Sequence, residues 1–263
     1  MRNGLKAFAN IKKYQLTVLL VVSLFFLQGC THVAKPAEGD PWEGMNRDLM
    51  GFNDMLDDAL MQPIARGYQY VMPKFLDTGI TNAFYNLNDV GVTINDFLQG
   101  KPEQGIQNSW RFVINSTFGI AGFIDVAEEI GLPRHDEDVN QTLAVWGVPR
   151  GPFIMMPLYG PGYVRGVFGR AGDMALHPLT YVAAFFGSGI GWTVTGLNGL
   201  DIIDARADML GLEKVVEEAA IDRYTFIKSG YTQQEDYLIN DGVVVIPELD
   251  DDIEDESLYE GLE

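Results

Sequence analysis

The sequence predicts an all-α fold, and three observations support this prediction. Apolar residues recur at three- and four-residue spacing through most of the chain. Prolines and capping residues stand where helices are expected to begin, and glycines break the pattern between them. No alternating, strand-like pattern interrupts the first half after residue 40. With a single cysteine the fold has no intramolecular disulfide, so packing must hold it together.

The first 29 residues are typical of an export signal. Residues 1–15 carry four basic residues and no acid, and 16–27 form an apolar stretch too short for a comfortable transmembrane span. This stretch ends in Leu27-Gln28-Gly29-Cys30, which matches a bacterial lipobox. The pattern predicts cleavage before Cys30 and lipidation of that cysteine, which anchors the chain in a membrane. A plain signal peptide with a chance cysteine is the alternative.

The residue after the cysteine indicates the destination. Thr31 stands where inner-membrane lipoproteins typically carry an aspartate. We therefore expect a lipid-anchored protein at the periplasmic face of the outer membrane.

The chain is expected to divide into four segments. Residues 1–29 are the signal peptide, 30–39 a flexible lipidated tether, 40–246 a single helical domain and 247–263 an acidic tail. The tail has nine acidic residues and no basic one, and such self-repulsion predicts a disordered, solvated segment. An electrostatic docking tail is the alternative.

The mature chain is strongly acidic. Without the signal peptide it keeps 14 basic and 37 acidic residues, a net charge of −23. This charge excludes nucleic acid as a partner, because phosphate contacts need clustered lysine and arginine. It also disfavours docking on an anionic lipid surface. Any membrane contact beyond the anchor must therefore be apolar.

The first helix is expected to begin at Asp40-Pro41-Trp42-Glu43. Asp40 is predicted to be the N-cap, Pro41 the first helical residue and Glu43 the reciprocal partner in a capping box. The residues that follow have the spacing of an amphipathic helix, as either an ordinary surface helix or a membrane-contacting one.

Further helices follow by the same criteria. They are predicted over about 75–98, from Pro102 onward, near 123–130 and within 207–240.

The middle of the chain carries almost no charge. Residues 151–200 hold three charged side chains, and 174–200 hold none. Such a stretch is typical of a transmembrane helix. Pro178 and five glycines interrupt it, however, and unpaired backbone groups in hydrocarbon are costly. We therefore expect two shorter helices hinged near Gly187 to Gly191, buried in the core or dipped into one leaflet.

The sequence offers no catalytic motif. Acylation removes Cys30 as a nucleophile, and no nucleophile elbow, P-loop or dinucleotide fingerprint is present. His177 precedes Pro178 in the apolar stretch and is expected to be a packed or interfacial histidine. The acidic cluster at His135–Asp138 lacks the ligand spacing of a calcium loop, so a solvated loop is predicted. We expect no enzyme activity, metal or cofactor.

Four stretches, in chain order, resemble the MlaA family, also called VacJ lipoproteins. They are residues 40–54, 97–133, 140–161 and 222–240, and together they span nearly the whole mature chain.

Two positions depart from the family pattern. Asn140 stands where the family usually has the glycine of D-F-G-Q-T, and Gly166 stands where it often has the aspartate of S-x-x-R-D. The departures affect local loop geometry and one charge pair.

The resemblance implies a helical, ring-like domain that lies in the inner leaflet of the outer membrane. It implies removal of mislocalised phospholipids from the outer leaflet and their transfer to a periplasmic lipid-carrier protein, which maintains lipid asymmetry. Trimeric outer-membrane porins are the implied membrane partners. The alternatives are a structural lipoprotein that scaffolds porins or the envelope without lipid transfer, and a lipid-processing enzyme, which the absent nucleophile disfavours.

Within 150–200 we expect the leaflet-embedded part of the protein and the wall of its lipid path. This expectation rests on two observations: the segment has few charged residues, and its glycines interrupt any simple membrane-spanning helix. A buried core in a soluble domain is the rival interpretation. The expected residues are Phe153, Met155, Met156, Tyr159, Phe185, Phe186 and Trp192.

Overall fold

The computed structural model describes residues 40–181 and 188–244. Cys30, Phe185 and Phe186 lie outside these residues, as do the signal peptide, the tether and the acidic tail. The segment boundaries and the lipidation of Cys30 therefore stay predictions.

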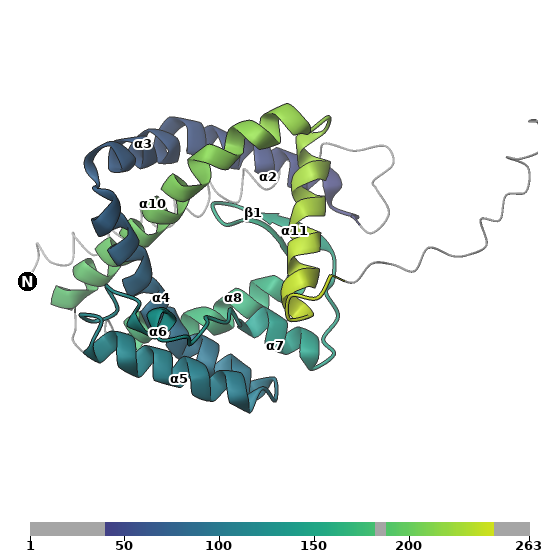
Figure 1. Ribbon diagram of the computed structural model, residues 1–263. Helices are drawn as coiled ribbons and strands as arrows, with labels where there is room; N and C mark the ends of the chain where they lie inside the picture. The colour runs from purple at the N-terminus through teal and green to yellow at the C-terminus, as the bar shows by residue number, and fades with distance from the viewer. Residues whose placement is uncertain (1–39, 182–187, 245–263) are drawn as a thin grey trace, which may run out of the picture.

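Helices form most of the described chain, and one short β-hairpin interrupts them (Figure 1). The elements are α2 (Glu43–Leu56), the π-helix η1 (Asp57–Met61), α3 (Gln62–Val71), α4 (Lys74–Leu98), α5 (Pro102–Thr117), α6 (Val126–Glu129), α7 (Val139–Val145), β1 (Phe153–Met156), β2 (Gly160–Tyr163), α8 (Val164–Leu176), α10 (Ser188–Ala219) and α11 (Arg223–Ile239).

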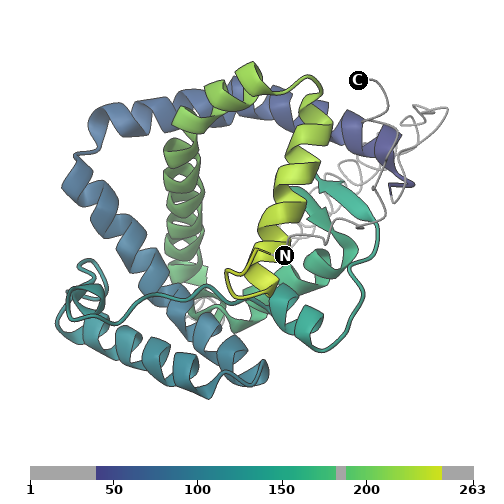
Figure 2. The ribbon, with the colours of Figure 1, turned by 45° about the vertical axis from the view of Figure 1, so that its right-hand side comes forward.

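Most helices follow the outline of the molecule in Figures 1 and 2, whereas α10 runs between α4 and α11 in Figure 2. The arm formed by α2, η1 and α3 leads to α4, and α5 packs along α4. The pair α7 and α8 and the hairpin follow, and β1 packs on α2, which joins the two ends of this path. α10 lies against α3, and α11 contacts α7 and β2. Within the described residues, contacts between neighbours along this path thus hold the elements together, with one small apolar cluster around Phe153.

Several predicted helices are confirmed. The helix expected over 75–98 is α4, Pro102 opens α5, and α6 lies inside the range 123–130. Proline favours the first helical position because its missing N–H has no partner there in any case.

The all-α prediction is wrong at one place, because β1 and β2 form an antiparallel hairpin with Phe153 opposite Tyr163. Two asparagines on α2 supply the hydrogen bonds that a third strand would give β1. Asn46 accepts from the Met155 N–H at 2.8 Å and donates to the Phe153 carbonyl at 3.1 Å. Asn53 donates to the Met156 carbonyl at 3.0 Å. A four-residue strand completed by distant side chains leaves no alternating pattern in the sequence.

The predicted start of the first helix is also wrong. The helix begins at Glu43 after Trp42, and the Asp40 side chain does not cap it. The fully buried Asp40 carboxylate instead accepts hydrogen bonds from Asn46 at 3.1 Å, from Lys228 at 2.9 Å and from the Tyr224 hydroxyl. Tertiary partners on α11 therefore replace the local capping role.

The apolar middle segment differs from its prediction as well. Gly189 and Gly191 lie inside α10, so a hinge at these two positions is wrong, while Gly187 lies outside the described residues. The pattern over 207–240 is divided between α10 and α11, with Asp222 as the N-cap of the second helix. In the described parts of the chain, no helix combines the length and the hydropathy needed to cross a bilayer.

Candidate functional site

Polar side chains fill the interior of this molecule, and apolar side chains cover much of its outside. Among the described residues, 17 polar or charged residues are buried against 10 hydrophobic ones. In the same part of the chain, 34 large hydrophobic residues are exposed. Water-soluble domains bury most of their large hydrophobic residues and seldom bury charged ones. The burial pattern is therefore the reverse of a soluble domain, and its exterior suits an apolar surrounding.

Helix α5 shows this inversion most clearly. Its apolar side chains Ile106, Trp110 and Val113 are exposed, with 54%, 57% and 45% of their surface accessible. Its opposite face, with Asn108 and Arg111, is buried. The apolar periodicity of the sequence locates the helix correctly, but the face that packs against the protein is the polar one.

The buried polar face of α5 is paired with partners from neighbouring elements. Arg111 donates to the Leu132 carbonyl and to the Asp125 carboxylate, and its guanidinium lies 4.0 Å from Asp89. Asn115 donates to Asp125 at 2.9 Å. Burial raises the pKa of Asp89 to about 6. Ion pairs and hydrogen bonds thus occupy the place that an apolar core has in most domains.

A second polar network joins α7, α8 and α11. Asn140 donates to Glu235 at 2.9 Å and accepts from the Arg165 Nε–H, also at 2.9 Å. Arg150 lies 2.8 Å from the other Glu235 oxygen, and Arg165 lies 3.3 Å from the first. Asn140 and Gly166, the two departures from the family pattern, are neighbours here, since a Cβ on Gly166 would lie 3.7 Å from Asn140 Oδ1.

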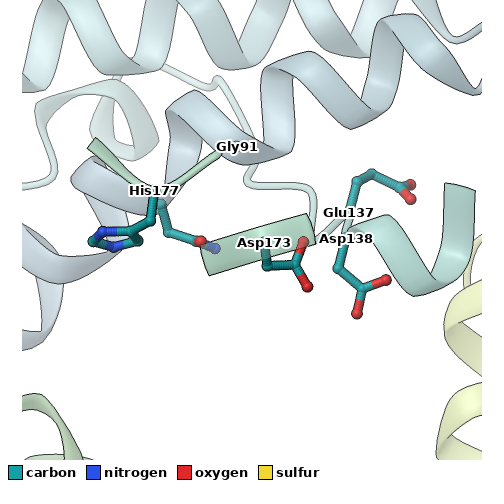
Figure 3. A pocket seen from close by; sticks show the side chains of 6 residues that line it. Gly91, Glu137, Asp138, Asp173 and His177 are labelled. Carbon is teal, nitrogen blue, oxygen red and sulfur yellow. The ribbon is translucent and has the colours of Figure 1, made fainter. Parts of the chain in front are cut away.

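Two cavities share Asp138, the N-cap residue of α7, and the second of them also includes Asn140 and Glu235 of this network. The first, named here the acidic cavity, has a volume of about 150 Å³ and is shown in Figure 3. Its lining residues are Asn88, Gly91, Glu137, Asp138, Asp173 and His177. The second, named here the mixed-charge cavity, has a volume of about 220 Å³. Its lining residues are Asp138, Asn140, Gln141, Gly166, Arg170, Tyr231, Gln234, Glu235 and Leu238.

Asp138 belongs to both walls, and Figure 3 shows its carboxylate beside that of Asp173. The two carboxylates accept from backbone N–H groups at the start of α7: Asp138 from Gln141 at 2.6 Å and Asp173 from Val139 at 2.9 Å. Burial raises the pKa of Asp173 to about 6, and the Asp138 charge acts in the same direction. Burial also lowers the pKa of His177. The acidic cavity therefore has no positively charged side chain in its lining at neutral pH.

The predicted lipid-path residues are placed in different environments. Phe153 and Met155 are 0% and 3% exposed and belong to the small apolar core with Met50, Tyr163 and Tyr224. Tyr159, at the tip of the hairpin, is 66% exposed. Phe153 and Met155 are therefore enclosed by the protein and Tyr159 is accessible, while their contact with lipid stays a prediction.

The other members of that set are described less fully. Met156 is half-buried on the hairpin, and Trp192 lies on α10. Phe185 and Phe186 lie outside the described residues, so their embedding stays a prediction.

The acidic side chains of His135–Asp138 do not form one site, because Glu137 and Asp138 each have their own partners. Glu137 pairs with Lys101 at 2.8 Å and accepts from Gln99 at 2.8 Å, while Asp138 caps α7. Among the residues that the structure describes, no group of three or more metal-binding side chains is placed to hold an ion.

A helical fold with a polar interior and an apolar exterior, together with the lipobox-like motif at Cys30, is what we expect of a helical lipoprotein of the bacterial envelope. The MlaA lipoprotein family model matches residues 38–238. The chain belongs to the MlaA lipoprotein family.

Characterised relatives agree with this assignment. The chain is 32% identical to proteins of Escherichia coli K12 and Shigella flexneri, each match covering 85% of this chain and 88% of the relative. It is 30% identical to a protein of Haemophilus influenzae, over 88% of this chain and 92% of that one. All three are named intermembrane phospholipid transport system lipoprotein MlaA.

A solved structure has the same fold. It superposes with a TM-score of 0.67 at 30% identity, covering 76% of this chain and 99% of its own. It was described as the structural basis for maintenance of bacterial outer membrane lipid asymmetry.

Proposed function

We propose that this chain is an intermembrane phospholipid transport lipoprotein that maintains the lipid asymmetry of the outer membrane. It removes mislocalised phospholipids from the outer leaflet and passes them to a periplasmic lipid-carrier protein. The inverted burial pattern carries this proposal, because a protein that handles lipid inside a leaflet needs an apolar exterior and a polar interior for headgroups. Membership in the MlaA family and the names of the relatives support it.

The protein acts by binding and passing lipid, without covalent chemistry. The family is one of transport lipoproteins, and this assignment, rather than the missing catalytic motifs, makes the chain a non-enzyme.

The proposed placement is a ring-like body in the inner leaflet, anchored at the periplasmic face through Cys30. The contact between α2 and β1, which joins the two ends of the path of neighbouring elements, supports a ring-like body, and the exposed apolar side chains of α5 support immersion in hydrocarbon. Trimeric porins are the proposed membrane partners, since an apolar rim with little positive charge suits another membrane protein.

Deletion of the gene and measurement of outer-leaflet phospholipid test the transport proposal. We expect phospholipid to accumulate in the outer leaflet of the deletion strain and to return to the normal level on complementation. A scaffold without transfer activity predicts altered porin or envelope assembly with a normal outer leaflet. That second result would contradict the transport proposal.

Lipidation is tested separately. Cys30→Ala is expected to abolish acyl labelling and to leave the precursor in or near the inner membrane. Wild-type-like outer-membrane fractionation of this variant, without label on either form, would contradict the lipobox.

A further inference from the structure

The wall of the mixed-charge cavity includes Gln141, which carries a buried hydrogen-bond acceptor without a partner in the described chain. Gln141 is 3% exposed, and its Nε2 donates to the Asp136 carbonyl at 3.0 Å. Its Oε1 has no hydrogen-bond partner within residues 40–181 and 188–244. Buried polar atoms in native folds are nearly always paired, so this oxygen is available to a donor from outside the chain.

The Asp138 carboxyl group belongs to the same cavity wall as Gln141. The Asp138 carboxylate accepts from the Gln141 N–H at 2.6 Å, which fixes its position at the start of α7. Burial raises the pKa of Asp138, and the like charges of Glu137 and Glu235 add to that effect. In the described chain, no lysine or arginine forms an ion pair with Asp138. A cationic donor would therefore satisfy the Asp138 carboxylate and the Gln141 oxygen together.

Arg170 from α8 lines the same cavity. Its two terminal nitrogens donate to the backbone carbonyls of Tyr159 at 3.3 Å and Pro161 at 3.2 Å. A guanidinium has five N–H donors in a planar fork, so part of its donor capacity is left for an anion. The Tyr231 hydroxyl belongs to the same wall. The cavity thus places anion-binding groups beside an ammonium-binding pair.

We propose that the mixed-charge cavity is a headgroup subsite for phospholipids of the phosphatidylethanolamine class, with the ammonium at Asp138 and Gln141 and the phosphate at Arg170. The proposal rests on the proposed function in phospholipid transport and adds a headgroup preference to it. The volume of about 220 Å³ far exceeds the roughly 10–15 Å³ that one water needs on the same measure, and it admits a small headgroup. Exposed Gln234 in the wall gives the cavity an opening to the surface.

The donor requirement discriminates among headgroups. A primary ammonium offers three N–H donors and a positive charge, which match the two acceptors. Choline is a quaternary ammonium with no N–H donor, and glycerol lacks the charge. The subsite therefore favours ethanolamine over both, because a buried acceptor left unpaired disfavours the other two ligands.

A lipid-retention assay tests the subsite. The full acylated protein, purified in dodecyl maltoside, is incubated with equimolar dioleoyl phosphatidylethanolamine and dioleoyl phosphatidylglycerol, and the retained lipids are quantified by mass spectrometry. We expect wild type to enrich phosphatidylethanolamine about tenfold, the scale of one charge-assisted hydrogen bond. Asp138→Asn is expected to remove the enrichment while total retained lipid stays the same.

Two further variants make the assay specific. Asparagine caps helices as well as aspartate does, so Asp138→Asn keeps α7, which circular dichroism checks. Gln141→Met removes the unpaired acceptor by an independent route and is expected to lower the enrichment. Asp136→Asn is the matched control, because it removes a neighbouring charge that is exposed and outside both cavities, and it should retain the wild-type ratio.

The outcomes separate the subsite from the proposed function. Equal retention of both lipids by wild type, or an unchanged ratio in both cavity variants, overturns the subsite and leaves transport standing. Retention of neither lipid by wild type contradicts the proposed function and the subsite with it. Displacement of the lipid by equimolar soluble O-phosphoethanolamine would assign the cavity to a soluble ligand and overturn the lipid assignment.

Discussion

Arg111 is a single side chain on which the packing of α5 depends. It is 1% exposed and lies between the carboxylates of Asp89 and Asp125. Removing one member of a buried ionic group leaves the remaining charges without compensation, which destabilises far more than loss of a surface pair.

We expect Arg111→Ala to lower the free energy of unfolding by about 3–5 kcal/mol. Arg223→Ala is the control, since the Arg223–Asp54 pair is more than one third exposed and should contribute no more than about 1 kcal/mol. Denaturant unfolding of the detergent-purified protein measures both. Equal losses in the two variants would show that Arg111 has no special structural role.

Asn140 and Gly166 are neighbouring positions at which this chain departs from the family pattern. The family that the sequence resembles usually has glycine at the first position and often has aspartate at the second, whereas this chain has asparagine and glycine there. Asn140 Oδ1 accepts from Arg165, one residue before Gly166. In this chain α7 therefore provides one acceptor for Arg165, and we expect positions 140 and 166 to be energetically coupled.

If positions 140 and 166 share the task of pairing Arg165, the effects of substitutions at the two positions on unfolding free energy should be coupled. Asn140→Gly should destabilise the protein, and Gly166→Asp in the same chain should recover part of the loss, with a coupling free energy of about 0.5–3 kcal/mol. A double-mutant cycle on unfolding free energies measures it. If the changes in unfolding free energy of the two single variants simply add in the double variant, positions 140 and 166 are not coupled.

At the scale of elements, the apolar periodicity of the sequence locates α4 and α5 well but not the face that each buries. The same pattern predicts an amphipathic helix whether its apolar face meets the protein core or a membrane. Only the buried polar residues, such as Asn108 and Asp96, show that the polar face is the one that packs against the protein. The hairpin and the two cavities lack a local signal altogether. Asp138 and Glu235 line one cavity from α7 and α11, which are joined only by tertiary folding.

The exposed apolar face of α5 gives an element-scale prediction. Trp110→Lys should leave the melting temperature in detergent nearly unchanged, because the side chain is 57% exposed. In the membrane the charge would cost roughly 2.5–3.5 kcal/mol if it lay near the bilayer centre, so phospholipid removal in cells should fall. Glu103→Lys, at an exposed polar position on the same helix, is the matched control. Unfolding of the Trp110→Lys protein would instead indicate a packed core.

At the scale of the whole molecule, buried carboxyl groups make stability depend on pH. Burial raises the pKa values of Asp89, Asp96 and Asp173 to about 6 from an ordinary 3.8. The folded protein therefore binds these protons more tightly than the unfolded chain, so stability falls as pH rises from about 4 through 6. Hydrogen bonds from Arg47 lower the pKa of Asp222. The stability that this carboxylate contributes is therefore lost only when the pH falls below the ordinary pKa of an aspartate.

We therefore expect a higher melting temperature at pH 5 than at pH 7.5. In a domain of this size, each 1 kcal/mol of stability shifts the melting temperature by about 2–4 °C, so we expect a difference of at least that size. Calorimetry in a non-ionic detergent measures it, and Asp173→Asn should flatten the dependence. A melting temperature that rises steadily from pH 5 to 7.5 would contradict the burial of these carboxyl groups.

The outward-facing hydrophobic side chains have a further consequence for biogenesis. A chain exported with a cleavable signal crosses an aqueous compartment before it reaches its bilayer, and 34 large hydrophobic side chains would then meet water. Such a surface self-associates at ordinary protein concentrations. If the predicted export signal is used, we therefore expect the polypeptide to need a holding chaperone that shields this surface while it crosses the aqueous compartment.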